Sequence, residues 1–180
     1  HMPEIEIRPA LSTDFEHFIH ITLSNRTEYV WQMDRVIEEG QITVRFREVR
    51  LPRAVQVDLP YSVDSVLKVA QAAGGVLAAV FQGIPIGYII LDETMVPSGV
   101  WIRYLAVAEQ YRRQGIGSAL LISAQEWAVQ RRFRKMILET QSKNYSVIRM
   151  ANKLGFELSG YNDRYYGNQD IALFFSRLLR

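Results

Sequence analysis

Two glycines follow an apolar segment and open a helical pattern, and this junction is the part of the chain best suited to bind an anion. Residues 112–118 read Arg-Arg-Gln-Gly-Ile-Gly-Ser. A helix start presents backbone N–H groups that lack partners within the helix, and the helix dipole adds partial positive charge there. Gly115 and Gly117 allow the backbone to approach a ligand closely, while Arg112 and Arg113 add full charges. The junction therefore predicts a site for a phosphate or pyrophosphate group.

The spacing of these glycines argues against two common nucleotide-binding motifs. A P-loop needs a Gly-Lys-Ser/Thr triplet after its first glycine, and the chain contains none. The dinucleotide fingerprint needs a third Gly or Ala, at the position where this chain has Leu120. Glu139 lies about where the ribose-binding acid of that fingerprint is expected. A nucleotide-binding oxidoreductase on a Rossmann fold therefore stays as an alternative.

A third pattern, Gln/Arg-x-x-Gly-x-Gly/Ala, fits residues 112–117. An apolar strand pattern precedes the motif and an amphipathic helical pattern follows it, with Asn144 and the pair Gly155-Phe156 further downstream. In these features the stretch from Gly83 to Gly160 resembles the GNAT superfamily of acetyl-CoA-dependent N-acyltransferases. Within that superfamily, the Leu-Glu-Thr-Gln segment at 138–141 and the residues after Gly155 look like those of streptothricin acetyltransferases.

The resemblance implies an α/β (α+β) fold, with a mixed, mostly antiparallel central sheet, helices on both faces and a βαβ unit that binds acetyl-CoA. Acetyl-CoA is then a cosubstrate, held where two strands diverge and leave backbone groups free to hydrogen-bond the pantetheine arm. The residues that the resemblance assigns to acetyl-CoA are Leu105, Ala106, Val107, Arg112, Arg113, Gln114, Gly115, Ile116, Gly117, Ser118 and Asn144.

Acetylation of an amine needs a base for the ammonium proton and a donor for the developing oxyanion. The end of the strand at 105–107 matches the family's oxyanion donor. Glu139 ends the next expected strand and is our candidate for the base, although a hydrogen-bonded strand end explains it equally well. Asn144 is expected beside the pantetheine or the thiolate, and it joins Glu139 in the expected catalytic set.

The departing thiolate also needs a proton, and here the chain departs from the family. The family's acid is a Tyr four residues before the Gly of Gly-Phe, where this chain has Ala151. Tyr166 is the substitute that we include among the catalytic residues, and Tyr145 and Tyr165 are alternatives. Each of the three also fits a packing role or a place in the acceptor pocket.

The composition bounds the class of protein. The 180 residues, 48% of them hydrophobic, are expected to form one domain with a real core. A formal charge of +2 indicates neither a nucleic-acid nor a membrane partner, and no apolar run approaches the ~18 residues of a membrane helix. The chain has no Cys, and His17 and His20 show no metal-ligand spacing, so no thiol nucleophile and no metal are expected. We expect a cytoplasmic protein, with His1-Met2 as a tag remnant.

Periodicity predicts the elements that position these residues. A strand through Ile5 and Ile7 is predicted at the start of the chain. Residues 25–75 are the hardest to assign to helices and strands, and they are expected to form a variable insertion on the acceptor side. The helices predicted are Asp14–Leu23, Trp31–Glu39, Tyr61–Ala73, a helix from the glycine junction to Arg132, and Asn144–Lys153. The other strands predicted are Gln41–Leu51, Val76–Phe81, Ile84–Leu91, Trp101–Val107, Lys135–Glu139, Phe156–Ser159 and Ile171–Phe175.

The function expected from these features is direct acetyl transfer from acetyl-CoA to a primary amine of a small molecule, of the antibiotic, polyamine or amino-acid type. Acetylation of a protein amine is one alternative. An acyl-CoA sensor without turnover is another, because Ala151 replaces the family's Tyr. The oligomeric state is unreadable from the sequence, and a homodimer is compatible with it.

Overall fold

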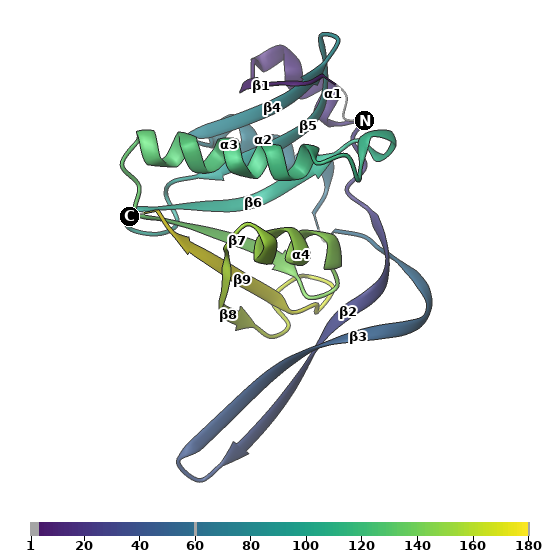
Figure 1. Ribbon diagram of the computed structural model, residues 1–180, viewed down its shortest axis with the longest axis vertical. Coiled ribbons are helices and arrows are strands. Elements are labelled where there is room, and N and C mark those ends of the chain that lie inside the picture. The colour runs from purple at the N-terminus through teal and green to yellow at the C-terminus, as the bar shows by residue number, and fades with distance from the viewer. Residues whose placement is uncertain (1–3, 60, 180) are drawn as a thin grey trace.

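A seven-stranded sheet organises the protein, with the strand order β1-β4-β5-β6-β7-β9-β8 (Figure 1). This computed structural model describes residues 4–59 and 61–179, so the predicted tag remnant lies outside the described residues. Every neighbouring pair in the sheet is antiparallel except β6 and β7. The strands are β1 Glu6–Pro9, β4 Gly75–Phe81, β5 Ile84–Asp92, β6 Gly99–Val107, β7 Lys135–Gln141, β8 Glu157–Asn162 and β9 Ala172–Leu178. The mixed, mostly antiparallel sheet predicted from the sequence is confirmed.

Helices cover both faces of this sheet, as predicted. They are α1 Phe15–Phe18, α2 Val63–Ala72, α3 Ile116–Gln130 and α4 Tyr145–Lys153. One buried apolar cluster joins α3 and α4 to the sheet and includes Leu120 and Ile148. A second cluster lies on the opposite face and includes Phe18 of α1 and Val66 of α2. The two clusters make the sheet the middle layer of three.

The unit β6-α3-β7 is the only parallel crossover among the described strands, and it positions the glycine junction. Two parallel neighbours need such a crossover, and α3 supplies it. At Gly87 on β5, a Cβ atom would lie 3.1 Å from the Ala106 carbonyl and 3.3 Å from Leu120 Cδ1. The glycine thus lets α3 lie close against the sheet.

The segment predicted as the helix Trp31–Glu39 is instead part of a long β-hairpin, so that prediction is wrong. Strand β2 spans Asn25–Glu38 and pairs antiparallel with β3, Gln41–Val57. Gly40 has φ +73°, which suits a tight two-residue hairpin turn, whereas the sequence interpretation took it as the end of a helix. The hairpin projects away from the seven-stranded sheet (Figure 1).

The middle of this hairpin packs on the domain, while its tip is exposed. Midway along the strands, Phe46 meets the ring of Tyr161 edge-on, with centroids 5.6 Å apart. The Trp31 backbone N–H donates to the Ser142 carbonyl at 3.1 Å. At the tip, large apolar side chains are exposed to solvent: Val36, Ile37 and Ile42. The tip therefore adds no apolar side chain to the core of the domain.

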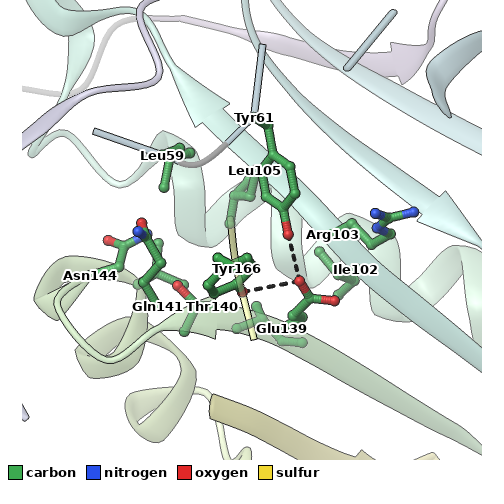
Figure 2. A pocket seen from close by; sticks show the side chains of 12 residues that line it. Leu59, Tyr61, Ile102, Arg103, Leu105, Glu139, Thr140, Gln141, Asn144 and Tyr166 are labelled. Carbon is green, nitrogen blue, oxygen red and sulfur yellow. Dashed lines mark hydrogen bonds between the residues drawn. The ribbon is translucent and has the colours of Figure 1, made fainter. Parts of the chain in front are cut away.

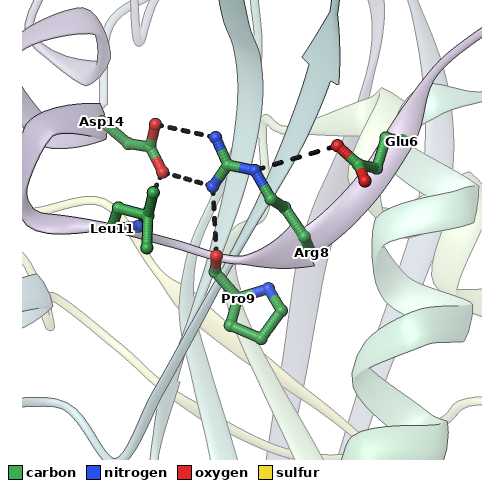
Figure 3. A network of polar contacts seen from close by, with 5 residues as sticks. All are labelled: Glu6, Arg8, Pro9, Leu11 and Asp14. Atoms are coloured by element: carbon green, nitrogen blue, oxygen red, sulfur yellow. Dashed lines mark hydrogen bonds and ion pairs between the residues drawn. The ribbon is translucent and has the colours of Figure 1, made fainter. Parts of the chain in front are cut away.

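The first helix is also shorter than predicted, because α1 ends at Phe18 rather than at Leu23. A 3₁₀ turn at Ser12–Asp14 precedes it, and the buried Asp14 carboxylate accepts both terminal nitrogens of Arg8, at 2.6 and 3.1 Å (Figure 3). The same carboxylate accepts the Leu11 backbone N–H at 2.7 Å. This pair ties α1 to β1. The residues after Phe18 form a loop that reaches the glycine junction.

Candidate functional site

Strands β6 and β7 separate at the centre of the sheet. Their parallel pairing runs only from Gly99–Lys135 to Ile102–Leu138, although β6 continues to Val107 and β7 to Gln141. Beyond Ile102 the two strands no longer pair with each other. The divergence that the family resemblance implied is therefore present, and it opens on the side of the glycine junction.

A β-bulge accompanies the separation. On β6, Tyr104 pairs with Ile90 and Ile102 pairs with Leu91, so Arg103 is an extra residue. Such a bulge shifts the alternation of side chains between the two faces of a sheet. Before it, Ile102 belongs to the cluster under α3, and after it Tyr104 belongs to the cluster under α1 and α2. Bulges are common beside functional sites because they re-aim side chains in this way.

The last residues of β6 turn backbone groups toward the gap. The Ala108 N–H donates to the Ile86 carbonyl on the β5 side at 2.7 Å. Backbone groups of consecutive strand residues alternate in direction, so Ala106 also faces β5, while Leu105 and Val107 face the opening. The backbone of Leu105 therefore faces the opening between β6 and β7.

A groove of about 290 Å³ runs from this opening to the start of α3. It contains every residue that the sequence assigned to acetyl-CoA except Gln114, whose side-chain amide instead donates to the Gln110 carbonyl at 3.5 Å. The predicted residues that line the groove are Leu105, Ala106, Val107, Arg112, Arg113, Gly115, Ile116, Gly117, Ser118 and Asn144.

The junction itself has the backbone shape of an anion site. Arg113 and Gly115 have positive φ angles of 62° and 84°, which turn the chain sharply before α3 begins at Ile116. The first N–H groups of a helix have no carbonyl partner within it. Those of residues 116–118 lie at the groove, at the positive end of the α3 dipole.

Arg112 has a different role from the one that its charge suggested. Its guanidinium donates to three backbone carbonyls: Val107 at 2.8 Å, Ser24 at 3.0 Å and Thr22 at 2.9 Å. Burial lowers the pKa of this guanidinium. Arg112 therefore ties the loop after α1 to the end of β6, and Arg113 is the arginine left exposed at the groove.

Glu139 lies at the other side of the opening, buried to 6% exposure. Its Oε2 accepts the hydroxyls of Tyr61 at 2.6 Å and Tyr166 at 3.0 Å, and its Oε1 accepts the indole N–H of Trp101 at 3.0 Å (Figure 2 draws the two tyrosine bonds). Burial and the neighbouring carboxylate raise the pKa of both tyrosines, so their hydroxyls stay protonated. The carboxylate is held in one orientation by three donors.

A small cavity of about 30 Å³ adjoins Glu139 and joins the groove. Four residues line both spaces: Leu59, Leu105, Asn144 and Val147. The Asn144 Oδ1 atom is buried there and has no hydrogen-bond partner among the described residues. The structure thus brings to one cavity the three residues that the sequence analysis named as candidates for catalysis: Glu139, Tyr166 and Asn144.

Aromatic rings surround Glu139. Tyr61 meets Tyr104 and Tyr166 edge-on, with centroids 4.9 and 5.7 Å apart. Further out, Phe174 meets Trp101 at 5.4 Å and Tyr165 at 5.9 Å. The sequence interpretation missed Tyr61 and Trp101 as partners of Glu139, and no spacing in the sequence signals them.

Two positions named in the search for a catalytic acid do not reach the cavity. Tyr145 stacks on Tyr29, with ring centroids 5.0 Å apart, and so has a packing role. Ala151, where the family has its Tyr, lies on the buried side of α4 and packs in the core. In the described part of the chain, no cluster of three His, Asp or Glu side chains is arranged to hold a metal. No helix within the described ranges has the length and apolarity needed to span a membrane.

Comparisons with known proteins agree with this geometry. The profile of the Acetyltransferase (GNAT) family matches residues 43–156. Streptothricin acetyltransferase A of Bacillus subtilis (strain 168) is 38% identical over 77 residues, which cover 41% of this chain and 44% of that protein. N-acetyltransferase family 8 member 3 of Rattus norvegicus is 30% identical over 71 residues, which cover 39% of this chain and 31% of that protein. The similarity thus spans less than half the length of either curated relative.

Solved structures resemble the whole fold. A nourseothricin acetyltransferase superposes with a TM-score of 0.80 at 20% identity, covering 98% of this chain and 99% of that one. A protein of Bacillus anthracis str. Ames, described as a streptothricin acetyltransferase and solved in complex with acetyl coenzyme A, gives a TM-score of 0.75 at 19% identity, covering 97% and 99% of the two chains. At these identities, the similarity shows a shared fold.

Proposed function

The chain belongs to the Acetyltransferase (GNAT) family, and on that premise we propose that it transfers the acetyl group of acetyl-CoA to a primary amine of a small molecule. One observation carries the proposal. The gap between β6 and β7 has an anion-binding helix start on one side and the buried carboxylate of Glu139 on the other. The groove and the Glu139 cavity meet at Leu105 and Asn144. A thioester held in the groove would thus present its carbonyl to an amine beside Glu139.

Acetyl-CoA fits the residues that line the groove. The N–H groups at the start of α3 and the exposed Arg113 suit its pyrophosphate. The Leu105 carbonyl suits an amide N–H of its pantetheine arm, because β7 does not pair with it. The unpartnered Oδ1 of Asn144 offers an acceptor at the junction of groove and cavity. When bound, acetyl-CoA supplies the acetyl thioester.

The side chains of the cavity supply the remaining chemistry. Glu139 accepts a proton from the ammonium group, which frees the nitrogen lone pair to attack the thioester carbonyl carbon. The Leu105 N–H donates to the oxygen of that carbonyl as negative charge develops on it. The new C–N bond forms, the C–S bond breaks, and the second proton that the nitrogen loses on becoming an amide passes through water to the departing sulfur. Because the chain has no Cys, transfer is direct rather than through an enzyme thiol.

Tyr166 supports this chemistry by holding Glu139. Its hydroxyl donates to the carboxylate and lines the Glu139 cavity rather than the groove where the sulfur leaves. Its raised pKa makes it a poor proton donor near neutral pH. A thiol has an ordinary pKa of roughly 8.5, so a thiolate can leave and take its proton from water. We therefore assign Tyr166 to the positioning of the base.

An acyl-CoA sensor without turnover is the second candidate, because Ala151 replaces the tyrosine that serves as the acid in the family. The ordered carboxylate beside the groove favours an enzyme, because a sensor does not need a base there. Titration calorimetry with acetyl-CoA tests cofactor binding, with NAD as the control ligand. Thiol release in a screen of amines then tests turnover. Tight binding without thiol release from any amine would favour the sensor, and binding of NAD alone would contradict both functions.

A homodimer and a cytoplasmic location belong to the same proposal. The exposed apolar tip of the β2–β3 hairpin, formed by Val36, Ile37 and Ile42, supports association of two copies. Sedimentation equilibrium of the wild type and of an Ile37→Ser variant tests the homodimer. Equal masses for both, each that of one chain, would contradict it.

A further inference from the structure

Three polar atoms around the Glu139 cavity are buried and have no hydrogen-bond partner among the described residues. They are Arg103 Nε, Gln141 Oε1 and Asn144 Oδ1, and all three residues line the cavity. Buried polar atoms normally have partners, because leaving one unpaired costs roughly 1–3 kcal/mol. Asn144 also lines the groove and serves acetyl-CoA in the proposed function. Arg103 and Gln141 therefore remain to be explained by the acceptor.

The charges of the cavity point to the kind of acceptor. Among its lining residues, Glu139 is the one acidic side chain and Arg103 the one basic side chain. Glu139 already accepts three hydrogen bonds, whereas Arg103 forms no ion pair within the described part of the chain. A polyamine carries several positive charges. Here it would find one carboxylate to pair with, and the positive charge of Arg103 would repel it. The balance of charges suits a molecule with one positive and one negative group.

The position of Arg103 is set by the fold. It is the extra residue of the β6 bulge, and its guanidinium carbon lies 5.7 Å from the centre of the Tyr104 ring. In Figure 2, Arg103 and Asn144 lie on opposite sides of the view, with Glu139 between them. An acceptor amine beside Glu139 can thus extend away from the acetyl-CoA groove toward Arg103. A guanidinium recognises a carboxylate well because it offers several N–H donors in one plane.

From these observations we infer that the acceptor is an amine that also carries a carboxylate, an acceptor of the amino-acid type. The inference rests on the proposed function and names the substrate class. The amine lies beside Glu139 and donates to Gln141 Oε1, and the carboxylate accepts from Arg103. Arg103 is then a specificity-determining residue.

The test compares matched acceptors in a thiol-release assay with saturating acetyl-CoA. One set contains ω-amino carboxylates of increasing chain length, a second contains their carboxamides, and a third contains diamines of the same lengths. The inference expects kcat/KM to be highest for one of the carboxylates. Arg103→Gln should lower that value by ~10- to 100-fold, and it should leave the values for the carboxamides and diamines unchanged or raised.

Two further variants separate specificity from folding. Arg103→Lys keeps the charge without the planar fork, so it should recover only part of the loss. Arg45→Gln removes an exposed arginine from the β2–β3 hairpin and should match the wild type. Acetyl-CoA affinity, measured by calorimetry, should be equal in all variants and shows that each is folded.

Other outcomes would overturn the inference and leave the proposed function standing. Diamines or carboxamides used as well as the carboxylates would do so, and so would an equal loss for all three acceptor sets in Arg103→Gln. Thiol release with carboxamides or diamines, but with none of the carboxylates, would also overturn the inference. A different result would contradict the proposed function: the wild type would not bind acetyl-CoA.

Discussion

The hydroxyl of Tyr61 lies 2.6 Å from Oε2 of Glu139 and joins two parts of the chain that are 78 residues apart. Tyr61 precedes α2, on one face of the sheet, and Glu139 is part of β7. With Tyr166 and Trp101 as further donors, the carboxylate has little freedom to rotate. Pre-orientation of this kind places a base without a cost in ordering it during the reaction.

Replacement of Glu139 by Gln tests its role as the base. The amide keeps the size of the side chain but cannot accept the ammonium proton. We expect kcat to fall by ~100- to 10,000-fold, the usual range for loss of general-base catalysis. Calorimetry should show unchanged acetyl-CoA affinity, because the groove does not include Glu139. A variant that keeps wild-type kcat would move the base to another residue.

The two arginines of the junction should respond differently to replacement by Ala. Arg112→Ala removes three hydrogen bonds to backbone carbonyls and should lower the free energy of unfolding by roughly 1–3 kcal/mol. It should also weaken acetyl-CoA binding, because residues 22–25 line the groove. Arg113→Ala should leave stability unchanged and should weaken binding chiefly at low salt. Urea unfolding and calorimetry at two salt concentrations measure both effects, and equal stability losses would contradict the assignment.

Gly117 offers a matched pair of variants. A Cβ atom there would meet only Met150 Sδ at 3.5 Å and Val107 Cγ2 at 3.9 Å, which are ordinary contacts. Gly117→Ala should therefore fold normally and bind acetyl-CoA with a small loss. Gly117→Asp places a carboxylate where the pyrophosphate is proposed, and we expect affinity to fall at least ~10-fold further. If both variants bind alike, the pyrophosphate lies elsewhere.

Stability should decline in alkaline solution because of the tyrosines that hold Glu139. The folded protein raises the pKa of Tyr61 and Tyr166, chiefly through burial, whereas the unfolded chain releases these protons near pH ~10. Their contribution is thus complete below pH ~10 and is lost as the pH rises above it. The free energy of unfolding, measured in urea from pH ~8 to ~11, should fall more steeply for the wild type than for Tyr166→Phe. Parallel curves would contradict this.

Acid should act on the pair that anchors α1. The hydrogen bond from Arg8 lowers the pKa of Asp14 below its ordinary value of about 3.9. Its contribution is present above that value and is lost as the pH falls through the lowered pKa. Asp14→Asn should cost roughly 1–3 kcal/mol at neutral pH, and the difference from the wild type should shrink below pH ~3. The free energy of unfolding is measured as the pH is lowered. The control is Glu16→Gln, which replaces an exposed carboxylate.

The glycine junction was readable from the sequence because its chemistry is local. Three fixed positions within 112–117 place the turn, the helix start and the anion site together. The apolar runs of β4, β5 and β6 were equally clear, because both faces of these strands are covered by helices and most of their side chains are buried. In such segments a continuous run of apolar residues predicts a buried strand.

The hairpin and the partners of Glu139 lacked a local signal. Strand β2 is mostly exposed, and a shift of register between Thr27 and Tyr29 interrupts its pairing with β3. Its apolar residues therefore do not alternate, and Gly40 suits a helix end as well as a hairpin turn. Tyr61 and Trp101 reach Glu139 only through the fold, across 78 and 38 residues. The role of Arg112 was missed for the same reason, since two of its three acceptors lie about 90 residues earlier.

The projecting β2–β3 hairpin also changes how the molecule moves through solution. A compact body with a long two-stranded extension has a higher frictional coefficient than a sphere of equal mass (Figure 1). A single chain should therefore diffuse slowly and elute early from a sizing column, as a heavier sphere would. Removal of the turn and the outer part of both strands should lower the frictional ratio of the single chain more than the loss of mass alone would.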